Sequence, residues 1–143
     1  MRIKGNNMGA NAIKLTAEDF SLEMKAKVYT GDPEINNVLL WVSVVSKNFS
    51  GAMEMEVGTL GLDEFIRQMC SMNKDMKGSA RIEEPYGNHC FIEFEMDRTG
   101  HITTRGRLVD FTHKMEFENT FDQTYLPAFV SKLCNTGIWQ EEK

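Results

Sequence analysis

Apolar and polar residues alternate over residues 49–57, and an apolar stripe with helical spacing follows over residues 62–70. Alternation with a period of two predicts a β-strand with one solvent-facing side, whereas apolar residues three and four positions apart predict an amphipathic helix. The same pair of patterns returns over residues 111–118 and 126–134. The strand patterns are offset by 62 positions and the helix patterns by 64, which we interpret as a two-residue difference in the strand-to-helix loop. The pattern therefore predicts two copies of one strand–strand–strand–helix unit.

Further strands are predicted in each copy. Residues 20–28 alternate strictly, while residues 38–45 are apolar on both faces. A strand of the second kind is covered on both sides or lies at the centre of a sheet. In the second copy, residues 89–96 and 101–109 alternate again.

Two hairpin turns join the last two strands of each copy. Lys47 and Asn48 are suited to a tight turn in the first copy, and Val109 and Asp110 occupy the corresponding place in the second. Both turns predict that the flanking strands pair directly. The first turn predicts these opposite pairs: Val42 with Met53, Leu40 with Met55, Trp41 with Glu54, and Leu39 with Glu56.

Together these elements predict an α+β fold in which two βββα-like units form an antiparallel sheet with two helices packed on it. The sheet is either open or curved into a sandwich. The 143 residues suit one domain, which we place at residues 12–139 with halves at about 19–77 and 78–137. We expect residues 1–11 to be flexible and residues 140–143 to form a solvated tail.

The charge balance changes the range of plausible partners. There are 21 acidic and 16 basic residues, giving a net charge of −5. This argues against nonspecific binding to nucleic acid or to an anionic membrane, and suits a basic protein partner. No apolar run approaches the roughly 20 residues that cross a bilayer, and the N-terminus has no secretion signal. We therefore expect a cytoplasmic protein.

The three cysteines support the same location. Cys70, Cys90 and Cys134 lie among apolar residues and form no CxxC pair. We expect all three to be buried free thiols in a reducing compartment.

Catalytic chemistry finds little support in the motifs. His89, His101 and His113 have no metal-ligand spacing, and neither a phosphate-binding glycine loop nor a GxSxG serine is present. We place His113 on the inner face near Met115, as a hydrogen-bonded core histidine. The sequence predicts no catalytic residue, no metal and no cofactor, and we expect the protein not to be an enzyme.

Carboxylates on the outer strand faces are the best candidates for binding. Trp41 shares its outer face with Glu54 and Glu56. An exposed aromatic side chain surrounded by charged residues is typical of a protein-binding hot spot. The alternatives are a plain solvated face and a Trp41 covered by the chain's own loops. Asp63 and Glu64 are expected in the first turn of the first helix, where negative charge complements the helix dipole. The candidate partner-binding residues are Trp41, Glu54, Glu56, Asp63, Glu64, Glu116 and Glu118.

The order of these segments resembles the small bacterial immunity proteins of the WapI type. The resemblance covers most of residues 12–135. It rests on the early strand Phe-Ser-Leu-Glu-Met-Lys-Ala that begins at Phe20, on the helix LDEFIRQM at residues 62–69, and on the closing helix LPAFVSKL at residues 126–133. It implies a cytoplasmic protein that neutralises a cognate contact-delivered toxin domain, often a nuclease, by binding it. It assigns no binding residues, because these vary with the toxin.

Two other functions stay open. A small-ligand-binding or enzymatic domain would use a pocket between sheet and helices, lined by His113, Met115 and Cys90. A structural subunit would pair through an edge strand, and the sequence leaves the oligomeric state undetermined.

Overall fold

The computed structural model describes residues 12–28 and 38–135. The predicted flexible N-terminus and the predicted tail at residues 140–143 lie outside the described residues. The described elements, in chain order, are β1 (Ile13–Ala17), β2 (Phe20–Val28), β3 (Val38–Ser46), β4 (Phe49–Val57), α2 (Thr59–Asp75), β5 (Gly78–Glu83), β6 (Phe91–Met96), β7 (His101–Asp110), β8 (His113–Asp122), the 3-10 turn η1 (Gln123–Tyr125) and α3 (Pro127–Asn135).

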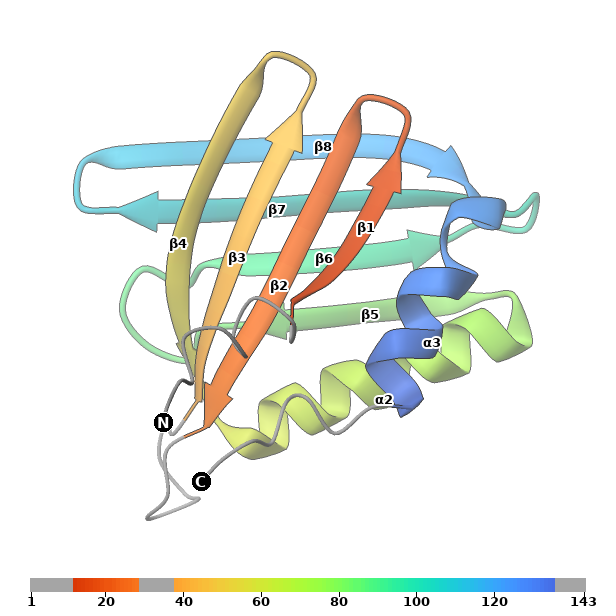
Figure 1. Ribbon diagram of the computed structural model, residues 1–143, viewed down its shortest axis with the longest axis horizontal. Helices are drawn as coiled ribbons and strands as arrows, with labels where there is room; N and C mark the ends of the chain where they lie inside the picture. Colours follow the sequence, from red (N-terminus) through yellow and green to blue (C-terminus); the bar gives the residue numbers. More distant parts are fainter. Residues whose placement is uncertain (1–11, 29–37, 136–143) are drawn as a thin grey trace.

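The strands form two antiparallel four-stranded sheets, in the orders β1-β2-β3-β4 and β5-β6-β7-β8. Figure 1 shows the first sheet lying across the second, with the strands of the two sheets crossing steeply. The predicted α+β class with βββα-like halves is confirmed, and the two sheets are packed on each other rather than joined into one open sheet. Each half has one further strand at its start, β1 or β5.

Alternation along β2 places one row of side chains in the core between the sheets. Phe20, Leu22 and Met24 are buried, while the residues between them are only partly covered. The ring of Phe20 stacks at 6.0 Å on Phe117 and at 6.0 Å on Phe121, both from the opposite sheet. Such aromatic pairs add about 0.5–1.5 kcal/mol to the burial of apolar area, so the alternating pattern fixes how the sheets face each other.

The first hairpin has the predicted register. Ser46 pairs with Phe49 across the turn, and the opposite pairs of β3 and β4 agree with the prediction at every position. The all-apolar β3 lies between β2 and β4, as expected of a strand inside a sheet.

The second hairpin turn was predicted two residues too early. Asp110 pairs with His113, so the turn residues are Phe111 and Thr112 rather than Val109 and Asp110. Lys47 and Phe111 thus hold corresponding places, at the same 64-residue separation that joins Cys70 to Cys134. The strands are therefore offset by 64 positions rather than 62, and the predicted two-residue difference in the strand-to-helix loop was wrong. A shift of two residues leaves every side chain on the same face, so alternation alone did not locate the turn.

The helices bury the stripes that their spacing predicts. Leu62, Phe65 and Met69 are buried on α2. Phe65 lies 6.3 Å from Phe94 of β6, which in turn lies 6.4 Å from Phe129 of α3. This chain of three rings joins both helices to the second sheet.

The position of Asp63 and Glu64 corrects a prediction. α2 begins at Thr59, directly after the cap residue Gly58, and its first turn holds no acidic residue. Asp63 and Glu64 therefore lie in the second turn, where the helix dipole acts on them less. Gly58 and Gly61 thus belong to the cap and the first turn of this helix.

Each helix covers an outer strand. α2 packs along β5, and the backbone N–H of Arg81 donates to the side-chain oxygen of Gln68 at 2.9 Å. α3 packs beside β1, as Figure 1 also shows. The helix that follows one sheet thus covers the first strand of the other.

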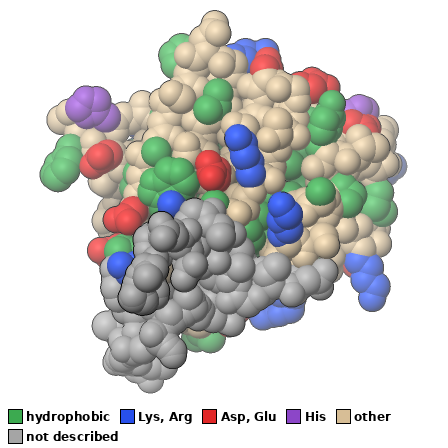
Figure 2. Space-filling model, viewed as in Figure 1, with side chains coloured by type: hydrophobic (Ala, Val, Ile, Leu, Met, Phe, Trp, Pro, Cys, Tyr) green, Lys and Arg blue, Asp and Glu red, His purple; other side chains and the backbone are tan. Residues whose placement is uncertain are grey.

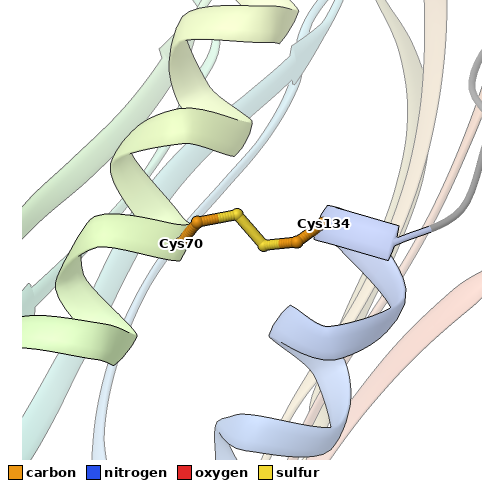
Figure 3. Close-up of a disulfide and its surroundings, with 2 residues drawn as sticks. All are labelled: Cys70 and Cys134. Carbon is orange, nitrogen blue, oxygen red and sulfur yellow. A yellow bond between two sulfur atoms is a disulfide. The ribbon is translucent and has the colours of Figure 1, made fainter.

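The cysteines correct a further prediction. Cys70 on α2 and Cys134 on α3 form a disulfide, with their Cα atoms 6.3 Å apart (Figure 3). The two cysteines face each other because the helices pack side by side. Only Cys90 is the buried free thiol that was predicted. Disulfides are rare in reducing compartments, so the cysteines no longer support a cytoplasmic location.

Candidate functional site

Trp41 lies on the outer face of the first sheet, in a row that crosses three strands. Its cross-strand neighbours are Lys25 on β2 and Glu54 on β4. The Lys25 ammonium lies 4.8 Å from the centre of the Trp41 ring, within the range of a cation–π contact. Trp41 is half-buried and Glu54 is exposed. In the next row, Leu39 separates Lys27 from the exposed Glu56.

The charges on this face are mixed in sign. Figure 2, which is viewed from this side, shows basic, acidic and apolar side chains interspersed over the described surface. The lysines lie on β1 and β2, whereas Glu54 and Glu56 lie on the outermost strand, β4. Neither glutamate forms an ion pair with another described residue. Two carboxylates without an ion pair in the described part of the chain therefore lie on β4, and Glu23 on β2 is a third on the same face.

The acidic face of the second sheet is largely neutralised. One row runs Arg81, Glu93, Arg105, Glu118 across β5 to β8, with alternating signs. Arg81 lies 3.1 Å from Glu93, and Arg105 lies 3.7 Å from Glu118 and 3.4 Å from Glu95. Exposed pairs of this kind add little stability, but they leave little net charge to attract a partner.

The remaining candidates lie elsewhere. Glu116 is exposed on β8 opposite Arg107. Asp63 and Glu64 are exposed on α2, where Glu64 pairs with Arg67 and accepts from the Gln68 amide at 3.2 Å. The structure thus brings Trp41, Glu54 and Glu56 together, and places the other four candidates on the second sheet and on α2.

Glu84 is a notable carboxylate that was not singled out from the sequence. It is buried, and its two oxygens accept from the backbone N–H of Glu56 at 3.0 Å and of Cys90 at 3.4 Å. It therefore ties the end of β4 to the loop after β5. The burial of Glu84 could have been predicted from the sequence, because alternation places it on the same inward face as Ala80 and Ile82.

The residues proposed to line a ligand pocket do not gather between sheet and helices. His113 is exposed at the start of β8, because the turn lies closer to it than predicted. The Cys90 sulfur lies 3.6 Å from the Met53 sulfur and accepts from the Val109 N–H at 3.3 Å. Burial raises the pKa of the Cys90 thiol, so it is a poor nucleophile.

Within residues 12–28 and 38–135, no three His, Cys, Asp or Glu side chains are grouped so that they could hold a metal ion. In the same part of the chain, neither helix is long and apolar enough to cross a membrane.

Comparison with known proteins decides the family. The model of the immunity protein WapI-like family matches residues 3–135. The chain belongs to this family. Membership supports a role as an immunity protein, implies a toxin as partner and suggests an inhibitor rather than an enzyme. The match begins earlier than the resemblance noted from residue 12.

More distant comparisons add nothing to this assignment. No curated protein matches the chain. A solved structure described as "Crystal structures of trypanosoma bruciei MRP1/MRP2" is similar over 94% of each chain, at 12% sequence identity and a TM-score of 0.41. A likeness this distant supports no conclusion about binding.

Proposed function

We propose that this WapI-like immunity protein neutralises a cognate toxin domain, most simply a nuclease, by binding and masking it. We place it in the cytoplasm on the family resemblance alone, since the disulfide does not support that location. The observation that carries the proposal is the row of Trp41 and Glu54, with Glu56 beside it, on the outer face of a rigid sheet in a member of an immunity family.

The chemistry of this row suits a basic partner. Surfaces that hold phosphate groups are rich in Lys and Arg, and unpaired carboxylates can engage such side chains directly. Trp41 adds a flat apolar surface, and tryptophan is one of the residues that contribute most to protein interfaces. The overall charge of −5 would also speed encounter with a positively charged domain.

The test uses candidate toxin domains encoded by the genes that neighbour the gene for this chain. Titration calorimetry should give one-to-one binding that weakens as salt increases, and a nuclease assay should show inhibition that is complete at equimolar protein. Inhibition by far less than one equivalent would instead indicate an enzymatic activity. If calorimetry detects no binding, masking is wrong.

Variants locate the surface. Trp41→Ala should weaken binding by about 2 kcal/mol, or roughly 30-fold, and the double change Glu54→Lys and Glu56→Lys should weaken it further. The matched control is Glu116→Lys with Glu118→Lys, which alters net charge equally on the opposite sheet. Equal losses from both double variants would show that overall charge, and not the Trp41 row, determines affinity.

A further inference from the structure

The outer strands of the two sheets are protected to different degrees. β5 is covered by α2 and β1 by α3, whereas neither helix packs along β4 or β8 in the described part of the chain. Along β8, the outward positions hold the charged side chains of Lys114, Glu116 and Glu118. Charged residues at such positions are a common means of preventing further strand pairing. β4 carries charge only in its second half, at Glu54 and Glu56, and Ser50, Gly51 and Ala52 before them offer almost no side-chain bulk.

The backbone of β4 is free over the same segment. Ser46 pairs with Phe49 across a two-residue turn, so alternate residues of β4 direct their N–H and C=O groups away from β3. The outward groups are those of Ser50, Ala52, Glu54 and Glu56. The backbone N–H of Glu56 donates to the Glu84 carboxylate, which confirms that the backbone groups of this residue point away from β3. The other three N–H groups have no partner among the described residues.

The second sheet extends beyond the edge strand β4, so that a strand added there would pack on it. Figure 1 shows the β7–β8 hairpin extending past β4 on its open side. Where the strands cross, a Cβ atom on Gly51 would lie 3.1 Å from the sulfur of Met115. Met115 and Met53 are both half-buried there, and methionine adapts readily to a new neighbour.

The tip of that hairpin carries an aromatic residue that the fold does not explain. Phe111 is 91% exposed and has a positive φ of 59°, a conformation that bulky residues adopt at a cost. Lys47, at the corresponding place in the first hairpin, also has positive φ but pairs with Asp19 at 2.9 Å. Aromatic residues are enriched in protein–protein interfaces relative to the rest of the surface.

We propose that β4 accepts an extended segment of the toxin domain as a fifth strand of the first sheet. Residues of that segment opposite Glu54 and next to Glu56 are basic, since unpaired carboxylates flank this side of the edge. The alternate residues are apolar and pack on Met53 and Met115, and Phe111 contacts the domain beyond the segment. This mode of recognition uses backbone hydrogen bonds for affinity and alternate side chains for specificity. The inference rests on the proposed function for the identity of the partner.

Amide exchange followed by NMR tests the strand directly, with the candidate toxin domains named above as probes. Slower exchange of the Ser50, Ala52 and Glu54 amides in the complex supports the inference. If the complex forms while these amides exchange as in the free protein, strand addition is wrong and masking stands. If no complex forms, both proposals fail together. Protection that appears on concentrating the chain alone would identify a second copy as the occupant and overturn the assignment to a toxin.

Paired variants supply a second measurement. Ala52→Pro removes one outward N–H but no bond to β3, and proline is tolerated at such an edge position. We expect at least a tenfold loss of affinity with an unchanged unfolding midpoint, whereas Ala52→Thr, which keeps the N–H, should bind within threefold of the parent. Phe111→Asn should bind more weakly but fold at least as stably, because asparagine tolerates positive φ. Equal affinity for the Pro and Thr variants would overturn the proposal.

Discussion

Removing the bond between Cys70 and Cys134 measures how far the two helices depend on a covalent link. The cysteines are 64 positions apart. For a loop of roughly 65 residues, the chain-entropy relation gives a stabilisation of about 4 kcal/mol at 25 °C, through restriction of the unfolded chain. Cys70 is half-buried and Cys134 exposed, so replacing both by serine removes little packing. We therefore expect the Cys70→Ser, Cys134→Ser variant to keep its structure but lose about 4 kcal/mol of unfolding free energy.

Urea unfolding of the oxidised parent, the reduced parent and the double variant provides the assay. Reduction should lower the midpoint of the parent to that of the variant and should leave the variant unchanged. The dependence of free energy on urea should steepen without the bond, because a longer free chain exposes more surface on unfolding. Thiol titration of the unfolded oxidised protein should find only Cys90. A variant as stable as the oxidised parent would refute the reasoning.

Three further changes test the core and the turns. Gly106→Ala should lower the unfolding free energy by about 3 kcal/mol, because the new Cβ would lie 2.5 Å from the Phe117 ring and 2.7 Å from a backbone oxygen; calorimetric melting measures this, and a neutral result would contradict the close approach. Thr104→Val should raise the unfolding free energy by about 1 kcal/mol, since the buried hydroxyl has no hydrogen-bond partner among the described residues; a loss in urea unfolding would show that a partner exists. Hydrogen bonds from the Thr99 side chain and the His101 backbone lower the pKa of Asp97 below its ordinary value of 3.8. The stabilisation by ionised Asp97 is therefore complete above that value and is lost as pH falls through the lower pKa of the folded state. The difference in unfolding free energy between the parent and Asp97→Asn should thus shrink on acidification. A difference independent of pH would count against this role.

Much of the fold follows from local pattern. Alternation predicted the strands, and the Lys47 turn fixed a register that places Trp41 beside Glu54. The position of the second turn did not follow, because Phe111 has none of the usual turn chemistry and alternation tolerates a slip of two residues.

The candidate site was predictable only in part. Outward-facing carboxylates can be identified from alternation, but their neutralisation depends on which strands lie side by side. Arg105 faces Glu118 only because β7 and β8 pair as they do. Likewise, the disulfide required knowledge that α2 and α3 pack together, which no periodicity in either helix reveals.

Each helix covers the first strand of the other half, and this arrangement limits how the protein can be divided. Cutting the chain in front of Gly78 would separate β5 from α2, and β1 from α3. Each fragment would then carry a bare strand edge and a helix with no strand to cover, a combination prone to aggregation. We expect the two pieces to be insoluble when produced alone and to reassemble when produced together, so that each half acts as a folding partner for the other.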